Sequence, residues 1–357
     1  MKDKWRHGIG IALAVAAVGC MPLMDQSAAQ DGGGHTSAFA ADEAAVETGL
    51  PAAPRYLIPG GQVVGVALKT RGVLVVAKAD GGRQGAQLRV GDVILSVQGE
   101  QVDSAQELAE QVDSAGADSV ELAVMRAGKE VTLQAASPLD GVDGRRRLGV
   151  WVRDSTAGVG TLSYIDPVSR AYGALGHAIV DADTGSMLSL QDGALMNARV
   201  VGVVRGQSGR AGELRGSFLK ENQQIGSLEL NSEFGIYGRM DEALQAALYP
   251  QGLPVGMRDE VHPGPAAIIS TVDQNGPQEY AIEIERCFAQ SPPGQKNMVI
   301  RVTDGRLIEK TGGIVQGMSG SPIIQDGRIV GAVTHVLVND PTRGYGIFIE
   351  NMLDAAG

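Results

Sequence analysis

The 357 residues exceed what one hydrophobic core usually organises, so the chain predicts two domains of ordinary size. Its 43% hydrophobic content, 50 glycines and 4% aromatic residues indicate β-rich architecture, and a net charge of -11 without a basic stripe excludes a typical nucleic-acid binder. With only Cys20 and Cys287, an intrachain disulfide framework is excluded, and neither a structural zinc ion nor another cofactor is expected.

The first residues have the order of an export signal. Basic side chains within the first six positions precede an apolar, uncharged stretch at 8–24. At about 17 residues, this stretch is near the lower length limit for a membrane-spanning helix. A cleaved signal peptide, an uncleaved anchor and a lipoprotein modified at Cys20 are therefore all compatible with the sequence. We expect residues 1–25 to be the signal peptide or membrane anchor, and residues 26–54, rich in Gly, Ala and Ser, to be a flexible linker.

Short strands and one helix are predicted from residue 55 onward. Runs rich in β-branched residues and bounded by turn residues occur at 62–68, 72–76, 93–97, 119–125 and 130–134. Ser104 followed by Glu107 is a capping-box signature, and apolar residues recur behind it at helical spacing. The segment LRVGDVILSVQG at 88–99 resembles the most recognisable stretch of PDZ domains. We therefore expect residues 55–138 to form a PDZ domain, α+β and rich in strands.

A peptide-binding edge is expected in this domain. PDZ domains add an extended peptide as a strand at a sheet edge and capture its terminal carboxylate on backbone N–H groups. The strand-like residues Gly65, Val66, Ala67 and Leu68 are the expected edge, and a peptide or protein C-terminus is the expected partner. The alternative is a β-rich spacer without a ligand.

A second, all-β domain is predicted after a hinge at 140–147. Strand-like runs return at 149–152, 160–163, 200–204, 266–272 and 298–302, and no helix-length periodic segment separates them. Many short strands with frequent Gly turns suit a β-barrel or a sandwich pair. We expect residues 145–357 to form this domain.

The segment GMSGSP at 317–322 is the strongest indication of catalytic chemistry in the chain. A serine nucleophile needs an exposed hydroxyl on a tight turn, with backbone N–H groups aimed at the developing oxyanion. Gly317 and Gly320 permit such a turn around Ser319. The amides of Gly317 and Ser319 are then the expected oxyanion-hole donors, as in the trypsin-like template. The alternative is an ordinary Gly/Ser loop between two strands.

The five histidines allow a general base to be chosen by elimination. His7 and His35 lie in the leader and the linker, and His262 lies in a polar turn rich in Pro and Gly. His335 is inside an apolar strand, so we expect it to be packed or hydrogen-bonded in the core. His177 stands at a turn entering a strand, upstream of the serine, and fits the base.

The orienting carboxylate is the remaining member of a triad. Asp304 lies at a strand end shortly before the serine, and its rivals are Asp181, Asp183 and Asp273. Asp304 is our choice, and it gives the order His, Asp, Ser, which is that of trypsin-like enzymes. A carboxylate at a strand end is otherwise a solvated turn residue.

Long motifs recur in one order along most of the chain. They lie at 58–62, 72–76, 149–162, 173–177, 183–185, 311–322, 331–336 and 339–341. Together they resemble the stage IV sporulation protein B family, PDZ-containing serine peptidases of endospore-forming bacteria, from about residue 55 to the C-terminus. The family's catalytic residues fall on His177, Asp304 and Ser319. The resemblance implies a mainly β chain in which a trypsin-like double β-barrel follows the PDZ domain.

The resemblance also implies regulatory proteolysis. Relatives are secreted into the space between forespore and mother cell, where they cut themselves near the N-terminus. They then cut a membrane-bound regulator, which releases a membrane metalloprotease that matures a late sigma factor. We therefore expect a self-cleaving serine endopeptidase of sporulation, exported and associated with a membrane through its N-terminal segment, whose PDZ domain recognises itself and its target.

Two other functions compete with this expectation. One is a periplasmic quality-control protease of the HtrA kind, although there the PDZ domain follows the protease. The other is a non-catalytic PDZ scaffold whose barrel has lost its activity. An intact set of His, Asp and Ser speaks against the scaffold.

Overall fold

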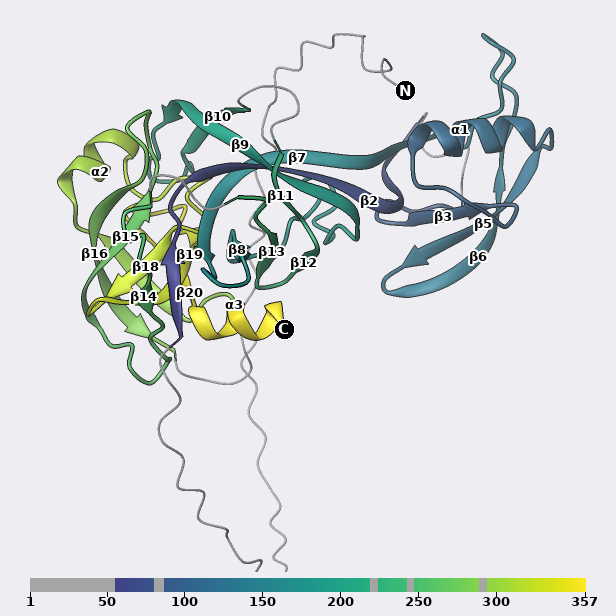
Figure 1. The fold of residues 1–357 in the computed structure, drawn as a ribbon. Coiled ribbons are helices and arrows are strands. Elements are labelled where there is room, and N and C mark those ends of the chain that lie inside the picture. The colour runs from purple at the N-terminus through teal and green to yellow at the C-terminus, as the bar shows by residue number, and fades with distance from the viewer. Residues whose placement is uncertain (1–54, 80–86, 219–223, 243–246, 289–293) are drawn as a thin grey trace, which may run out of the picture.

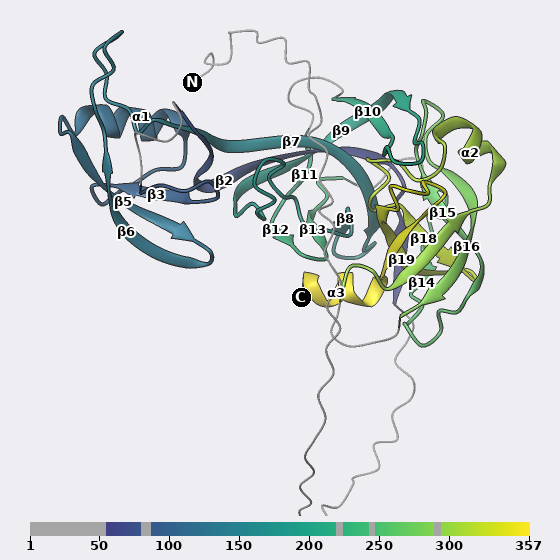
Figure 2. The same ribbon diagram turned by 180° about the vertical axis from the view of Figure 1, so that it is seen from behind.

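The computed structural model describes residues 55–79, 87–218, 224–242, 247–288 and 294–357. The expected signal or anchor at 1–25 and the expected linker at 26–54 lie outside the described residues. The described chain is mainly β and divides into a smaller lobe around helix α1 and a larger body (Figures 1 and 2). Among the residues described, no helix is both long enough and apolar enough to cross a membrane.

We call the smaller lobe the PDZ lobe, after the domain that its residues are expected to form. Its helix α1 (Ala105–Ser114) begins at Ser104, whose hydroxyl accepts the N–H of Glu107 at 3.1 Å, as the capping-box signature predicts. Leu108 and Val112 form the apolar face of the helix, which packs against the lobe's core. The shorter strands of this lobe are β3 (Val93–Val97), β4 (Glu100–Gln101), β5 (Ser119–Arg126) and β6 (Lys129–Ala136).

Two long strands connect the lobe to the body. Strand β2 (Val63–Lys78) and strand β7 (Val150–Ile165) are antiparallel partners along most of their length, and Figure 1 shows them running side by side between the two parts. The second half of β2 pairs with β3 in the PDZ lobe, and its first half pairs with β9 (Leu190–Val204) in the body. The two parts therefore share one sheet.

This pairing corrects the expected peptide-binding edge at Gly65, Val66, Ala67 and Leu68. All four residues pair with β7 on one side and with β9 on the other, so their backbone groups are already used inside the sheet. In the PDZ lobe, residues 150–153 of β7 pair with β2 alone among the described strands. One of the two outer strands of that lobe, the other being β6, is therefore supplied by a segment that the sequence placed in the second domain.

The first part of the body is a half-barrel around the shared strands. Buried aliphatic residues such as Leu68, Leu162, Leu195 and Ile236 form its core. Its remaining strands are β1 (Tyr56–Pro59), β8 (Ala171–Ala174), β10 (Glu213–Phe218), β11 (Gln224–Ser227), β12 (Leu230–Ser232), β13 (Gly235–Arg239) and β14 (Leu253–Pro254).

The second part of the body is a closed six-stranded barrel in the order β15-β16-β17-β20-β19-β18. Closure pairs every strand on both sides, and the inward residues, among them Ile268, Ile300 and Val333, fill the interior. Two helices accompany it, α2 (Gly305–Thr311) and α3 (Ile349–Ala356). The barrel strands are β15 (Gly264–Ser270), β16 (Gln278–Cys287), β17 (Met298–Val302), β18 (Pro322–Gln325), β19 (Arg328–Val336) and β20 (Arg343–Phe348).

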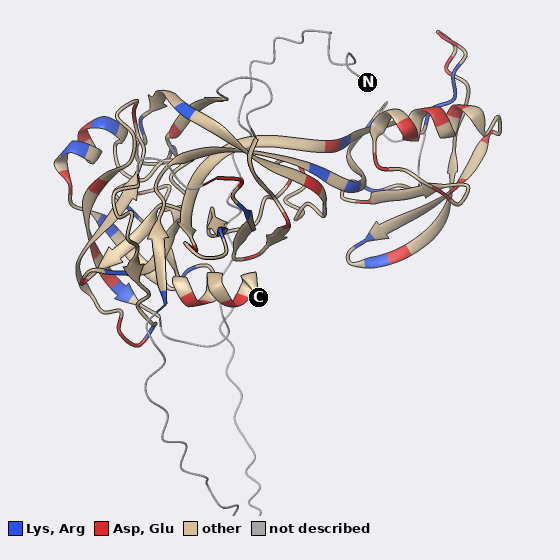
Figure 3. Ribbon diagram, in the orientation of Figure 1, with Lys and Arg blue, Asp and Glu red and all other residues tan. Residues whose placement is uncertain are grey.

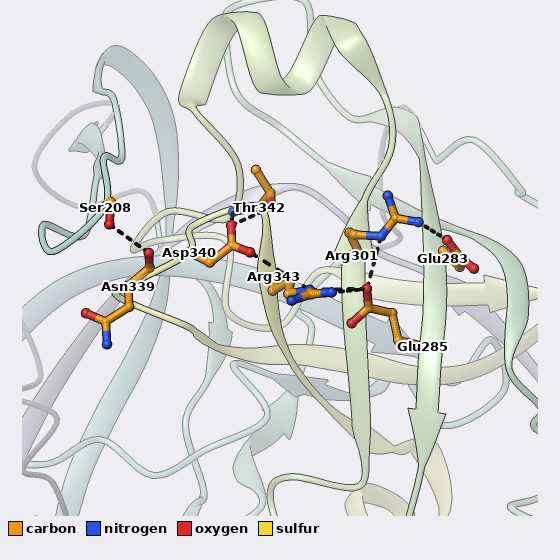
Figure 4. Close-up of polar contacts among 8 residues, drawn as sticks. All are labelled: Ser208, Glu283, Glu285, Arg301, Asn339, Asp340, Thr342 and Arg343. Carbon is orange, nitrogen blue, oxygen red and sulfur yellow. Dashed lines mark hydrogen bonds and ion pairs between the residues drawn. The ribbon is translucent and has the colours of Figure 1, made fainter.

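Charged side chains lie on both parts with the two signs interspersed (Figure 3). On the outer face of the closed barrel, Glu285 of β16 accepts bonds from Arg301 of β17 at 3.0 Å and from Arg343 of β20 at 2.9 Å (Figure 4). The hydroxyl of Ser208 donates to the carbonyl of Asn339 at 2.8 Å, which ties the loop after β9 to the turn before β20. The Glu285 contacts join neighbouring strands across the barrel surface, and the Ser208 contact joins the half-barrel to the closed barrel.

Candidate active site

The turn at residues 317–321, just before β18, lies where the half-barrel and the closed barrel meet. Gly317 and Gly320 have φ angles of 95° and 96°, a region that side chains other than glycine rarely adopt. A Cβ atom at Gly320 would lie 2.1 Å from the carbonyl oxygen of Thr161 and 2.6 Å from the nitrogen of Leu175. Only glycine therefore allows the turn to approach the half-barrel so closely.

Ser319 presents its hydroxyl at this turn. Its side chain is half-buried, and Oγ donates a hydrogen bond of 2.8 Å to the carbonyl of Thr334 on β19. Ser321, two residues on, is fully buried, and its hydroxyl has no partner among the residues described. Of the two serines in the motif, Ser319 is the one that a substrate can reach.

Two backbone N–H groups of the turn, those of Gly317 and Ser319, are the expected oxyanion-hole donors. The carbonyl of Gln316 accepts the N–H of Leu214 at 2.8 Å, and the carbonyl of Met318 accepts the N–H of Ser321 at 2.9 Å. In a trans peptide the N–H points opposite to the carbonyl, so these two bonds orient the N–H groups of Gly317 and Ser319. Neither N–H donates to an acceptor within the described part of the chain. Both meet the requirement for preorganised donors.

Thr161 of β7 holds the turn in this conformation. Its hydroxyl donates to the carbonyl of Gly317 at 2.7 Å, and its N–H donates to the carbonyl of Ser319 at 3.0 Å. The residue is 1% exposed, so water does not compete for these bonds. Sequence reasoning missed Thr161, because a threonine in a strand is ordinary, although it lies within one of the long motifs.

His177 reaches the same place from the half-barrel. It follows β8 after two successive residues with positive φ, Leu175 at 69° and Gly176 at 71°, which turn the chain sharply. The N–H of Leu175 donates to the carbonyl of Thr161 at 3.2 Å, so the histidine and the serine turn are anchored to one residue. Burial lowers the pKa of His177 below its ordinary value, which favours the neutral form that a general base needs.

His335 is the second imidazole of the site, which the sequence placed in the core. Its ring centroid lies 5.3 Å from that of His177, with the two rings tilted by 38°. It follows Thr334 directly, the residue whose carbonyl accepts the Ser319 hydroxyl. An apolar strand pattern does not reveal which side chain at the end of the strand faces a neighbouring element, so no sequence signal identified it.

The structure does not bring Asp304 to His177. The carboxylate of Asp304 is the N-cap of α2 and accepts from the N–H of Arg306 at 2.9 Å and from its guanidinium at 2.7 Å. The Arg306 guanidinium, opposed by partial burial, holds the pKa of Asp304 at about 2. Its expected role in orienting His177 stays a prediction from the sequence.

Strand register explains this separation. His335 pairs with Tyr345, and Tyr345 pairs with Val299, so these three residues are level across β19, β20 and β17. Strand β17 continues for three residues beyond Val299, about 10 Å at roughly 3.3 Å per residue, before Asp304 is reached. Strand β17 is also two strands away from β19 in the barrel, which adds about 10 Å across the sheet. A carboxylate there is beyond hydrogen-bonding reach of the imidazoles.

The rival carboxylates also have other partners. Asp181 pairs with Arg153 and accepts the N–H groups of its own loop, and Asp183 pairs with Arg153 at 2.8 Å. Asp273 pairs with Lys310 beside α2. No carboxylate in the described ranges forms a hydrogen bond with His177, whose Nδ1 instead donates to the carbonyl of Ala178 at 2.9 Å. The described residues also contain no group of three or more His, Cys, Asp or Glu side chains placed to hold a metal ion.

Comparisons with known proteins divide the chain in two. Residues 144–353 match the protein-family model described as SpoIVB peptidase S55, and residues 62–136 match the PDZ-domain model. None of the curated protein sequences matches the chain. Among solved structures, the PDZ domain of an SdrC-like protein from Listeria monocytogenes is 22% identical, with a TM-score of 0.21, over 23% of this chain and 87% of that one. The active form of the Rv3671c protease from M. tuberculosis is 13% identical, with a TM-score of 0.31, over 57% of this chain and 75% of that one.

Proposed function

Because the chain belongs to the SpoIVB peptidase S55 family and carries a PDZ domain, we propose that it is a regulatory endopeptidase of sporulation. The family match confirms the resemblance that the motifs predict, and it makes the chain a serine peptidase. The proposal concerns the residues that carry out the reaction, the substrates that are cut and the place where this happens.

The first part of the proposal assigns Ser319 as nucleophile and His177 as general base. Nε2 of His177 takes the proton of the Ser319 hydroxyl as Oγ attacks the scissile carbonyl carbon. The carbonyl oxygen becomes an oxyanion that accepts hydrogen bonds from the N–H groups of Gly317 and Ser319. The tetrahedral intermediate collapses, the protonated His177 gives its proton to the leaving amine, and an acyl-enzyme remains. Water, deprotonated by His177, then attacks the ester. When the second tetrahedral intermediate collapses, His177 returns the proton to Oγ, so Ser319 is regenerated and the acid product leaves.

One observation carries this assignment. Ser319 is the accessible serine of a turn whose two unpartnered N–H groups are held in place by neighbouring bonds, and Thr161 anchors both that turn and the segment leading to His177. The Ser319 hydroxyl is bonded to the Thr334 carbonyl, so it must leave that acceptor before its proton passes to His177. Such looser geometry is common in sites without substrate.

The second part of the proposal concerns the biological role. The basic-then-apolar N-terminus supports export, and we propose that the mature protein acts in the space between forespore and mother cell, associated with a membrane through its N-terminal segment. Its substrates are itself and a membrane-bound sporulation regulator, as the resemblance implies. The PDZ domain selects them through a peptide or protein C-terminus.

Activity labelling tests the catalytic assignment. Purified protein is incubated with a fluorophosphonate probe, which reacts with activated serines, and its fragments are identified by N-terminal sequencing. Ser319→Ala should abolish labelling and self-cleavage, while Ser321→Ala, the matched control two residues on, should retain labelling. Labelling of folded Ser319→Ala, or its loss in Ser321→Ala alone, would overturn the assignment. Absence of labelling in the folded wild-type protein would favour the scaffold.

The choice of substrate separates the regulatory role from quality control. A regulatory enzyme should produce one or two defined N-termini from its own chain and leave unfolded casein intact. A quality-control enzyme of the HtrA kind should instead degrade casein into many peptides. Processive degradation of casein by the wild-type protein would therefore count against the proposed role.

A further inference from the structure

His335 occupies a position in which a purely structural residue would be unusual. It lies near the end of β19, next to the carbonyl that accepts the Ser319 hydroxyl. The 5.3 Å between its ring centroid and that of His177 is within the range of direct aromatic contact. The nitrogen Nδ1 of His335 is buried and has no partner among the described residues. A buried polar atom without a partner is costly, so its presence beside the proposed nucleophile and base calls for an explanation.

The orientation of the His177 ring is set without a carboxylate. Its Nδ1 lies 2.9 Å from the carbonyl oxygen of Ala178. A carbonyl oxygen can only accept, so Nδ1 carries the hydrogen and Nε2 carries the lone pair. The catalytic tautomer is therefore specified by a backbone group, and what remains is to keep the ring from rotating away.

His335 can do this because it remains neutral. Burial, and then the neighbouring His177 and Lys296, lower the pKa of His335 to about 4. The Lys296 amino group lies 5.0 Å from the ring centroid of Tyr345, the partner of His335 on β20. Near neutral pH, the His335 ring is thus an uncharged polar surface against His177 and does not repel the imidazolium that forms when Ser319 is deprotonated.

We propose that His335 is a positioning residue for His177, a neutral imidazole that packs against the base and, with the Ala178 carbonyl, fixes its orientation. In this role it acts through the orientation and the proton affinity of His177. This inference rests on the catalytic assignment of Ser319 and His177 proposed above.

The first test is the pH dependence of fluorophosphonate labelling in the full-length protein. His335→Phe keeps a ring but removes both nitrogens, and labelling should slow by about tenfold or more because the base loses its position. The acidic midpoint should also move to lower pH, because a wholly apolar neighbour makes the His177 imidazolium harder to form. His335→Gln, which keeps a neutral polar group, should keep the midpoint of the wild-type protein.

The matched control is His262→Phe. His262 is an exposed histidine of the same half of the chain, hydrogen-bonded to Asp326 at 2.9 Å, and its loss should change neither the rate nor the midpoint. A folded His335→Phe protein with an unchanged rate and midpoint would overturn the proposal. An upward shift of the midpoint would overturn it as well, since His335 would then act as a repelling charge.

A second measurement needs neither activity nor a stable His335 variant. Nitrogen NMR of the full-length Ser319→Ala protein, labelled with ¹⁵N in histidine, reports the tautomer and the titration of each ring. His177 should be protonated at Nδ1 in its neutral form, and His335 should remain neutral to about pH 5. Protonation of neutral His177 at Nε2, or independent titration of His335 at its ordinary pKa, would refute the inference. Because Ser319→Ala should abolish labelling, residual labelling of this protein would refute the catalytic assignment separately.

Discussion

Two substitutions of Asp304 separate a catalytic from a structural role of this residue. Asn is as good an N-cap as Asp, so Asp304→Asn keeps the helix cap but removes the charge, whereas Asp304→Ala removes both. If Asp304 orients His177, as its place in the sequence predicts, Asp304→Asn should slow labelling by about 10⁴, the loss seen in the trypsin-like template. The structure instead places the carboxylate on α2 and Arg306, which predicts an essentially unchanged labelling rate.

The expected effect of both variants is on stability. A pKa lowered from 3.8 to about 2 corresponds to about 2 kcal/mol of stabilisation by the charged form. Because the Arg306 side chain is 65% exposed, solvent screening reduces this to about 1 kcal/mol. Loss of the cap adds about 1 kcal/mol, so Asp304→Ala should lose about 2 kcal/mol and Asp304→Asn about 1 kcal/mol.

Urea unfolding as a function of pH measures these differences. The folded-state pKa is depressed, so the stabilisation is complete above the unfolded value near 4 and is lost as the pH falls through about 2. The stability difference between the wild-type protein and Asp304→Asn should therefore shrink between pH 5 and pH 2. A folded Asp304→Asn protein with wild-type stability and a labelling rate reduced by several orders of magnitude would refute the structural interpretation.

Three further predictions concern other contacts of the structure. Thr161→Val should slow labelling by about tenfold or more, because the Gly317 carbonyl loses its buried donor and the oxyanion-hole turn loosens. Thr161→Ser should restore most of the rate, and equal labelling rates of the Val and Ser variants would contradict this prediction. Deleting residues 1–144 should abolish labelling, because the half-barrel loses the half of β2 that lies inside it and unfolds. Replacing residues 79–149 by a short turn should instead preserve labelling, which a gel-based assay measures. Glu285→Ala should lower the free energy of unfolding in urea by about 1 kcal/mol, because Arg301 and Arg343 lose their shared partner. The decrease should be smaller at high salt, where ion pairs are screened, and a larger decrease there would contradict the ion-pair account.

Features that depend on local backbone requirements could be predicted from the sequence. The Gly-Met-Ser-Gly turn contains two residues with positive φ, and the glycines at 317 and 320 predict these conformations. The cap at Ser104 is likewise a contact between near neighbours in the chain. Long motifs in a constant order predicted the family, and the alternation of short strands with glycine turns predicted a mainly β chain.

Features that depend on which strands become neighbours were decided by the tertiary structure. Nothing in residues 65–68 reveals that β7 and β9 cover both of their edges, because a strand has the same pattern at an edge and inside a sheet. The separation of Asp304 from His335 follows from the register of β17, β20 and β19. The approach of His335 to His177 depends on how the end of β19 packs against the turn that follows β8. Thr161 acquires its role only because β7 passes beside the serine turn. Sequence determined the conformations that the chain needs locally, and packing between distant strands decided which side chains share the site, because register depends on contacts among residues far apart in the chain.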